Sequence, residues 1–212
     1  VADVARKLGI QVMLNDLPRE EREESTMFAS LKSIAEKCDI ITFHVPLYKE
    51  GKYKTYHLAD KHFFHSLKKG AVIMNTSRGE VIEEALLEAL RSGILSDAVI
   101  DVWEHEPDID LELLEKVIIG TPHIAGYSAD GKANATRMSL EALCRFFRIE
   151  TDYRITPPEP KNKLISTATY EEASLMIYDP RRDSDALKSH PGLFEQLRGD
   201  YPLRREEGAY RI

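Results

Sequence analysis

The chain has 212 residues, of which 42% are hydrophobic and 31% are charged, and its formal net charge is −7. This length can bury a sizeable core in one large domain or two smaller ones. The negative charge argues against a non-specific nucleic-acid surface, because acidic surfaces repel phosphate backbones. No apolar run is long enough to cross a bilayer, and the first residues lack the continuous apolar core of a signal peptide. We therefore expect a cytoplasmic protein without a membrane partner.

Short apolar runs alternate with longer amphipathic stretches over residues 1–149. The runs that we predict to be strands are Gln11–Asn15, Asp39–Phe43, Ala71–Asn75, Ala98–Val102 and Val117–Ile119. The stretches that we predict to be helices are Phe28–Lys37, Asp60–Leu67, Glu80–Ser92 and Gly131–Phe147. Gly70 and Gly93 follow helical stretches, where left-handed caps are common. This alternation predicts an α/β fold with a doubly wound parallel sheet.

The alternation of predicted strands and helices ends near residue 150. The run Thr156–Pro160 contains three prolines and indicates a linker over residues 150–160. Beyond it, residues 161–212 contain one predicted strand, Lys163–Thr169, and one predicted helix, Tyr170–Tyr178. About fifty residues are too few to fold alone comfortably. We therefore expect a small C-terminal α+β domain that packs on the main domain or on another subunit.

The N-terminal residues read as the end of a helix that runs directly into a strand. In a nucleotide-binding βαβ unit, that helix follows a strand and a glycine-rich turn. Neither precedes the helix here. We therefore expect a fragment of a longer protein, in which the first strand and the glycine-rich loop of the domain are missing.

Two predicted strand ends carry residues suited to a dinucleotide. Asp16 would accept hydrogen bonds from the adenosine ribose and would repel a 2′-phosphate, which favours NAD over NADP despite Arg19 and Arg22 nearby. The alternative is a turn aspartate before Pro18. At the next strand end, Pro46 would fix an extended backbone beside the cofactor, although this signal is weak by itself.

Arg78 follows the predicted strand Ala71–Asn75 and precedes a glycine and a helix. A guanidinium group can bind a carboxylate through two hydrogen bonds and so orient a 2-hydroxy acid. The alternative is a surface arginine at the start of a helix. That alternative is disfavoured, because positive charge is unwelcome at a helix N-terminus unless an anion lies there.

Three further ionisable residues follow the later strands. Asp101 lies within an apolar run and needs a partner, which could be a nicotinamide carboxamide or a neighbouring loop. His123 could move a hydroxyl proton near neutral pH, and Glu106 could hold its tautomer. All these groups come just after predicted strands, at the edge of an open α/β sheet where ligands bind. No residue is assigned to a metal.

Three runs of this sequence resemble, in order, the diagnostic blocks of the D-2-hydroxyacid dehydrogenases: NTSRGE at 75–80, VIDVWEHEP at 99–107 and TPHIAGYS at 121–128. The resemblance implies a Rossmann-like NAD-binding domain and hydride transfer between C2 of a 2-hydroxy acid and the nicotinamide. The positions that it places against the cofactor are Val45, Asp101 and Gly126.

The same resemblance implies a catalytic set. Arg78 would bind the substrate carboxylate, and His123 would exchange the C2 hydroxyl proton with support from Glu106. Tyr127 would lie near the substrate. Because the glycine-rich loop and a substrate domain have no counterpart in this sequence, we expect residues 1–212 alone to bind NAD poorly and not to turn over.

A narrower resemblance comes from the long loop at 47–58 and from the run at 178–206. Both are similar to members of the family that act on a phosphorylated 2-hydroxy acid and have an extra C-terminal dimerisation domain. This implies a small phosphorylated substrate and a homodimer. Two alternatives stay open: a dehydrogenase for glycerate, phosphoglycerate or lactate, and an NAD-sensing corepressor that uses the same fold.

Overall fold

The computed structural model describes residues 1–82, 85–167 and 169–211. By its internal contacts the chain forms two compact units, Val1–Gly120 and Thr121–Ile212, and each is described here by itself. The domain boundaries expected from the sequence, with a linker at 150–160, stay a prediction. Residues 151–160 contain no helix or strand.

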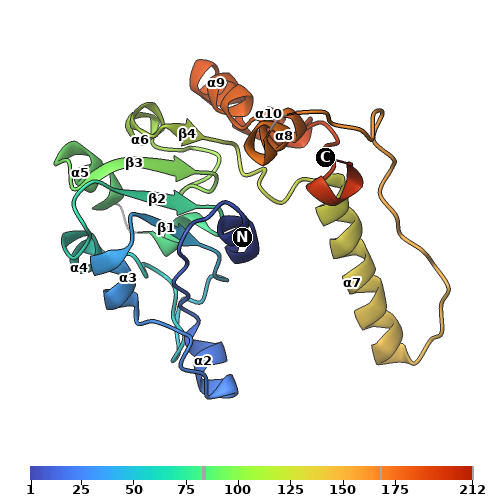
Figure 1. The fold of residues 1–212 in the computed structure, drawn as a ribbon, viewed down its shortest axis with the longest axis horizontal. Helices are drawn as coiled ribbons and strands as arrows, with labels where there is room; N and C mark the ends of the chain where they lie inside the picture. Colours follow the sequence, from blue (N-terminus) through green and yellow to red (C-terminus); the bar gives the residue numbers. More distant parts are fainter. Residues whose placement is uncertain (83–84, 168, 212) are drawn as a thin grey trace. The chain divides into compact units, whose positions relative to one another are not determined.

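The first unit is built on a four-stranded parallel sheet (Figure 1). Its strands lie in chain order: β1 (Ile40–Phe43), β2 (Ala71–Asn75), β3 (Leu95–Ile100) and β4 (Ile119–Gly120). All three pairings are parallel, and Asn75 at the end of β2 aligns with Phe43 and Ile100. The predicted parallel sheet with flanking helices is thereby confirmed.

Short helices precede or connect these strands: α3 (Leu31–Lys37), α4 (Lys61–His65), α5 (Ala85–Arg91) and α6 (Leu111–Lys116). Side chains cap three of them, since Ser30, Asp60 and Asp110 each accept a backbone N–H three residues further on. Because right-handed crossovers between strands in chain order return on one side, α4, α5 and α6 cover the same face of the sheet. Neighbouring helices of this layer are in contact.

Side chains from the sheet and from this helix layer form the core of the first unit. Its most buried apolar members include Ile73, Phe64, Val81, Ala98 and Val102. The two predicted glycine caps are confirmed, with φ of +81° at Gly70 and +71° at Gly93.

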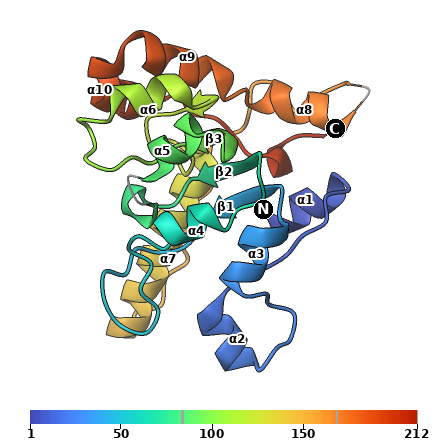
Figure 2. The same ribbon diagram turned by 90° about the vertical axis from the view of Figure 1, so that its left-hand side faces the viewer.

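The predicted strand Gln11–Asn15 is wrong. This segment lies between α1 (Ala2–Lys7) and α2 (Leu17–Glu23) (Figure 2). Within the described residues it makes a single β-bridge, from Leu14 to Phe28. None of residues 11–15 is buried, so this apolar run lacks the burial on both faces that would stabilise a strand.

The second unit is mainly helical in its described residues. Its helices are α7 (Ala129–Phe147), α8 (Tyr170–Ile177), α9 (Arg181–Ser189) and α10 (Phe194–Gly199), with 3₁₀ turns at Pro191–Leu193 and Glu207–Ala209. Helix α8 matches the predicted helix Tyr170–Tyr178. The predicted strand Lys163–Thr169 is wrong: only Leu164 bridges, to Arg211, among its described members, and residue 168 lies outside the described residues. One bridge gives too few ladder hydrogen bonds to hold a strand.

Candidate active site

The end of β2 is built around the side chain of Asn75, which is 1% exposed. Its amide nitrogen donates to the carbonyl of Arg78 at 2.9 Å. Its amide oxygen accepts from the backbone N–H of Ser77 at 3.1 Å and from the Ser77 hydroxyl at 2.8 Å. A buried amide that is hydrogen-bonded through both its oxygen and its nitrogen fixes the backbone to which it bonds. Asn75 therefore sets the course of residues 76–78, which present the exposed guanidinium of Arg78.

A close backbone approach joins this turn to the segment after β3. A Cβ atom at Gly79 would lie 2.1 Å from both the carbonyl carbon and the carbonyl oxygen of Trp103, and 2.5 Å from the nitrogen of Glu104. No side chain fits there. The glycine after Arg78 is therefore required by packing, and it keeps the turn that carries Arg78 against the segment 101–106.

That segment contains two of the predicted site residues. Asp101 directly follows β3, is 3% exposed, and donates its backbone N–H to the carbonyl of Asn75 at 2.9 Å. The carboxylate of Glu106 accepts the backbone N–H of Trp103 at 2.8 Å. Arg78, Asp101 and Glu106 thus lie on two adjoining segments at the carboxyl edge of the sheet, as the sequence predicts.

The end of β1 adds a histidine that sequence reasoning did not assign to the site. His44 bonds through one ring nitrogen to the hydroxyl of Thr42 at 2.8 Å and through the other to that of Thr76 at 3.3 Å. Burial lowers the pKa of His44, which favours its neutral form. Its position directly after a predicted strand was the available signal. Next to it lie Val45 and Pro46, and the Pro46 carbonyl accepts the Thr55 hydroxyl at 2.5 Å.

The long loop after β1 reaches back to the same edge. The backbone N–H of His57 donates to the carbonyl of Glu80 at 2.8 Å, and that of Ala59 to Val81 at 3.1 Å. The His57 ring lies 3.5 Å from the carboxylate of Glu104. The loop therefore borders the Arg78 turn.

The second unit carries the other predicted residues. His123 has a positive φ of 56° and is partly buried; Gly126 is exposed, and Tyr127 is partly buried. A Cβ at Gly126 would meet no atom within 4 Å, so there is open space beside this backbone. The structure places His123, Gly126 and Tyr127 together in one short loop before α7.

Asp16 lies elsewhere than the sequence predicts. It is the N-cap of α2, and its carboxylate accepts the backbone N–H of Arg19 at 3.1 Å. The strand that was to deliver it to the sheet edge is not formed. Its contact with a ribose stays a prediction.

The described residues contain no cluster of three or more His, Cys, Asp or Glu side chains arranged for a metal ion. None of their helices has the length and apolar character to cross a membrane.

A parallel α/β sheet with polar side chains at the carboxyl ends of neighbouring strands defines a nucleotide-binding domain. Residues 1–125 match the NAD binding domain of the D-isomer specific 2-hydroxyacid dehydrogenases, and the chain belongs to that family. The residues present fit this cofactor at two places: the buried polar end of β2 and β3, and the open space at Gly126.

The chain is also similar to curated relatives along its whole length. It is 70% identical to the erythronate-4-phosphate dehydrogenase of Bacteroides thetaiotaomicron, over 100% of this chain and 61% of the relative. It is 42% identical to the enzyme of the same name from Porphyromonas gingivalis, over 99% of this chain and 59% of the relative. The chain thus spans about 60% of the length of these relatives.

Solved structures agree on the fold. A D-lactate dehydrogenase from Aquifex aeolicus, in complex with NAD and lactic acid, matches with a TM-score of 0.57 and 28% identity, over 70% of this chain and 49% of that one. The apo form of Rhodotorula graminis D-mandelate dehydrogenase matches with a TM-score of 0.51 and 32% identity, over 70% of this chain and 44% of that one.

Proposed function

We propose that the protein oxidises 4-phospho-D-erythronate at C2 to the 2-oxo acid with NAD, as a cytoplasmic homodimer in pyridoxal phosphate (vitamin B6) biosynthesis. The observation that carries this proposal is the 70% identity to an erythronate-4-phosphate dehydrogenase over the whole chain. That identity extends through residues 126–212, beyond the part that matches the family's NAD-binding domain. The similarity therefore includes residues 161–212, which we assign to dimerisation.

The geometry of the first unit supports a role for Arg78 in binding the substrate carboxylate. Its guanidinium is exposed, and its Nη1 donates to the Ser77 carbonyl at 2.6 Å, which leaves further N–H groups to meet a carboxylate. The rigid Asn75 amide and the close contact at Gly79 hold its backbone. Such fixed geometry is what orients C2 for hydride transfer.

We assign proton transfer to His123, which would take the proton of the C2 hydroxyl as the C2 hydrogen leaves as hydride. Glu106 would orient the imidazole. When bound, NAD supplies the hydride acceptor. The residues that we assign to holding it are Asp16, Val45, Pro46, Asp101 and Gly126, and we assign Tyr127 to the substrate.

The direct test is turnover by the full-length protein. We expect NADH to form with 4-phospho-D-erythronate and NAD, and much less with D-lactate, D-glycerate or D-3-phosphoglycerate. Preference for one of these other acids would replace the proposed substrate, and absence of turnover on all of them would reject the proposed reaction.

A substitution tests the assigned base. His123→Asn should lower kcat by about 100- to 10,000-fold, because general acid–base catalysis contributes on that order. The matched control is His62→Asn, since His62 is an exposed residue of α4. Near-normal kcat in the folded His123→Asn enzyme would exclude the assigned role.

A further inference from the structure

The loop that carries His123, here called the His123 loop (residues 121–128), contains backbone hydrogen bonds within itself. His123 donates its N–H to the Thr121 carbonyl at 3.1 Å, and Tyr127 to that of Ile124 at 2.9 Å. His123 also adopts a positive φ, which costs a non-glycine residue conformational energy. Such a backbone persists only where surrounding groups hold it.

Some of those groups come from a segment about eighty residues later, here called the strap (residues 201–206). The Nη2 atom of Arg204 donates to two carbonyls of the His123 loop, those of Ile124 at 3.3 Å and Ala125 at 3.0 Å. The guanidinium carbon of Arg204 lies 4.2 Å from the ring centroid of Tyr178, close enough for a cation–π contact. Arg204 is thereby held while it bonds the backbone beside His123.

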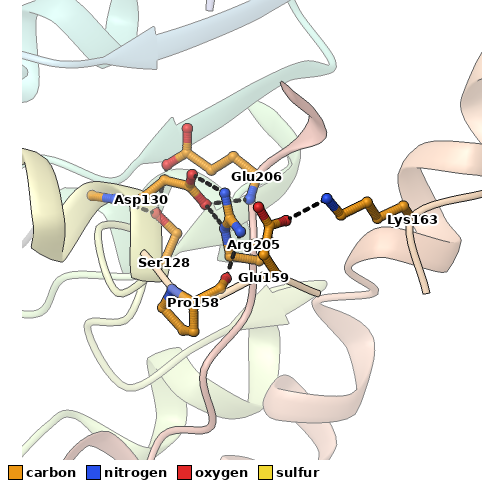
Figure 3. A network of polar contacts seen from close by, with 8 residues as sticks. Ser128, Asp130, Pro158, Glu159, Lys163, Arg205 and Glu206 are labelled. Carbon is orange, nitrogen blue, oxygen red and sulfur yellow. Dashed lines mark hydrogen bonds and ion pairs between the residues drawn. The ribbon is translucent and has the colours of Figure 1, made fainter. Parts of the chain in front are cut away.

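Polar contacts fix the strap to the start of α7, where the His123 loop ends (Figure 3). The guanidinium of Arg205 makes two bonds to Asp130, at 2.9 and 3.0 Å, and Asp130 also accepts the N–H of Glu206 at 2.8 Å. The Ser128 hydroxyl donates to Glu206 at 2.5 Å and accepts the N–H of Gly131 at 2.8 Å. The strap and the helix start therefore form one bonded unit.

An aromatic contact also joins the strap to the His123 loop. The rings of Tyr127 and Tyr201 meet edge to face with centroids 6.3 Å apart, and Tyr201 is 8% exposed. The ammonium of Lys132 lies 4.7 Å from the Tyr127 ring centroid. The strap thus contacts the His123 loop through both its backbone and its tyrosine.

We propose that Arg204 is a positioning residue for the reaction: it holds the Ile124 and Ala125 carbonyls and so fixes the His123 backbone and the Tyr127 ring. This inference rests on the proposed function, in which His123 handles the hydroxyl proton and Tyr127 faces the substrate. Arg204 itself would touch neither substrate nor cofactor. It would act on the chemical step, because a small misplacement of a catalytic group lowers the rate steeply.

The test in the full-length enzyme is whether loss of Arg204 lowers kcat without changing KM for NAD. Arg204→Ala should lower kcat by about 10- to 100-fold and leave KM for NAD within about 2-fold, since much of the assigned cofactor contact lies in the first unit. Arg204→Lys keeps the charge without the planar guanidinium, so its kcat should lie between those of wild type and Arg204→Ala. Added methylguanidinium should restore part of the kcat of Arg204→Ala. The matched control, Arg182→Ala, removes an exposed arginine of α9 and should behave as wild type.

Hydrogen exchange of the same proteins gives a readout independent of activity. In Arg204→Ala the amides of residues 123–127 should exchange faster, while those of β2 stay as in wild type. Unchanged exchange in the loop, or a kcat within about 2-fold of wild type for Arg204→Ala, would overturn the proposal. The proposal would also be overturned if Arg204→Ala lost kcat in proportion to its loss of folded protein and if methylguanidinium did not restore kcat. If wild type fails to oxidise 4-phospho-D-erythronate, the proposed function fails, and the exchange data still decide whether Arg204 holds the loop.

Discussion

Asp130 in the first turn of α7 and Arg205 in the strap form a two-point ion pair, with Nε 2.9 Å from Oδ2 and Nη2 3.0 Å from Oδ1. The two side chains are 25% and 14% exposed, so water screens them only partly. The Arg205 guanidinium, with the N–H of Glu206, lowers the pKa of Asp130. The pair joins segments that are 75 residues apart in the sequence.

Replacement of Asp130 by Asn should destabilise the protein in a pH-dependent way. A lowered folded-state pKa means that the ionised Asp130 stabilises the fold above its unfolded pKa of about 4, and that this stabilisation is lost as the pH falls through the lower folded value. Denaturant unfolding should show a deficit of about 1–2 kcal/mol at pH 7 that shrinks on acidification. Asp152→Asn, at an exposed residue, is the control. A deficit that is independent of pH would contradict the ion-pair account.

Gly79→Ala should be strongly destabilising. The added Cβ would overlap the backbone of Trp103, and backbone atoms cannot rotate away as a side chain can. We expect a loss of about 3 kcal/mol or more in the free energy of unfolding, by thermal or denaturant melting. At Gly192 a Cβ would meet nothing within 4 Å, so Gly192→Ala is the matched control. Equal stability of the two variants would mean that the two segments are not in close contact.

Asn75→Ala should impair both stability and substrate binding. It leaves the Arg78 carbonyl and the Ser77 N–H without their amide partner in a buried place. The expected cost is about 1–3 kcal/mol, together with a higher KM for the hydroxy acid as the Arg78 turn loosens. Asn15→Ala is the control: it removes the hydrogen bond from the Asn15 side-chain amide to the Ala29 carbonyl at an exposed site, and it should leave this KM unchanged. An unaltered KM in Asn75→Ala would show that Asn75 does not control Arg78.

Arg78→Lys should weaken substrate binding while the charge is retained. An ammonium cannot reproduce the parallel two-point contact of a guanidinium with a carboxylate. Steady-state kinetics should give a KM for the hydroxy acid that is about 10- to 100-fold higher, with KM for NAD little changed. Arg182→Lys is the control, at an exposed residue of the second unit. If both KM values rise together, Arg78 serves the cofactor rather than the carboxylate.

The central sheet was predictable because its strands contain short apolar runs that suit burial on both faces. Ala71–Asn75 was predicted with its observed bounds, and the other strands of the sheet shifted by one to three residues. Helix α6 was not predicted, although Asp110 caps it. The strand predicted at 11–15 is not formed, because a short apolar run alone does not say whether a partner strand lies alongside it.

The candidate site was predictable to the extent that strand ends determine it. Asp101 directly follows β3 and Arg78 lies in the turn after β2, so the topology itself brings their segments to one edge. The overlap that excludes a side chain at Gly79 could not be foreseen, because it depends on where Trp103 lies in space. The contact of Arg204 with the Ile124 carbonyl spans 80 residues, and no local pattern reports a pairing at that distance.

That separation has a consequence for biosynthesis. During translation the His123 loop emerges about eighty residues before Arg204, so its carbonyls cannot receive the guanidinium until the strap has left the ribosome. Maturation of the loop should therefore follow synthesis of the strap, after the strands of the first unit have been made. A ribosome stalled before residue 204 would display a nascent chain whose Ile124 and Ala125 carbonyls lack the Arg204 guanidinium.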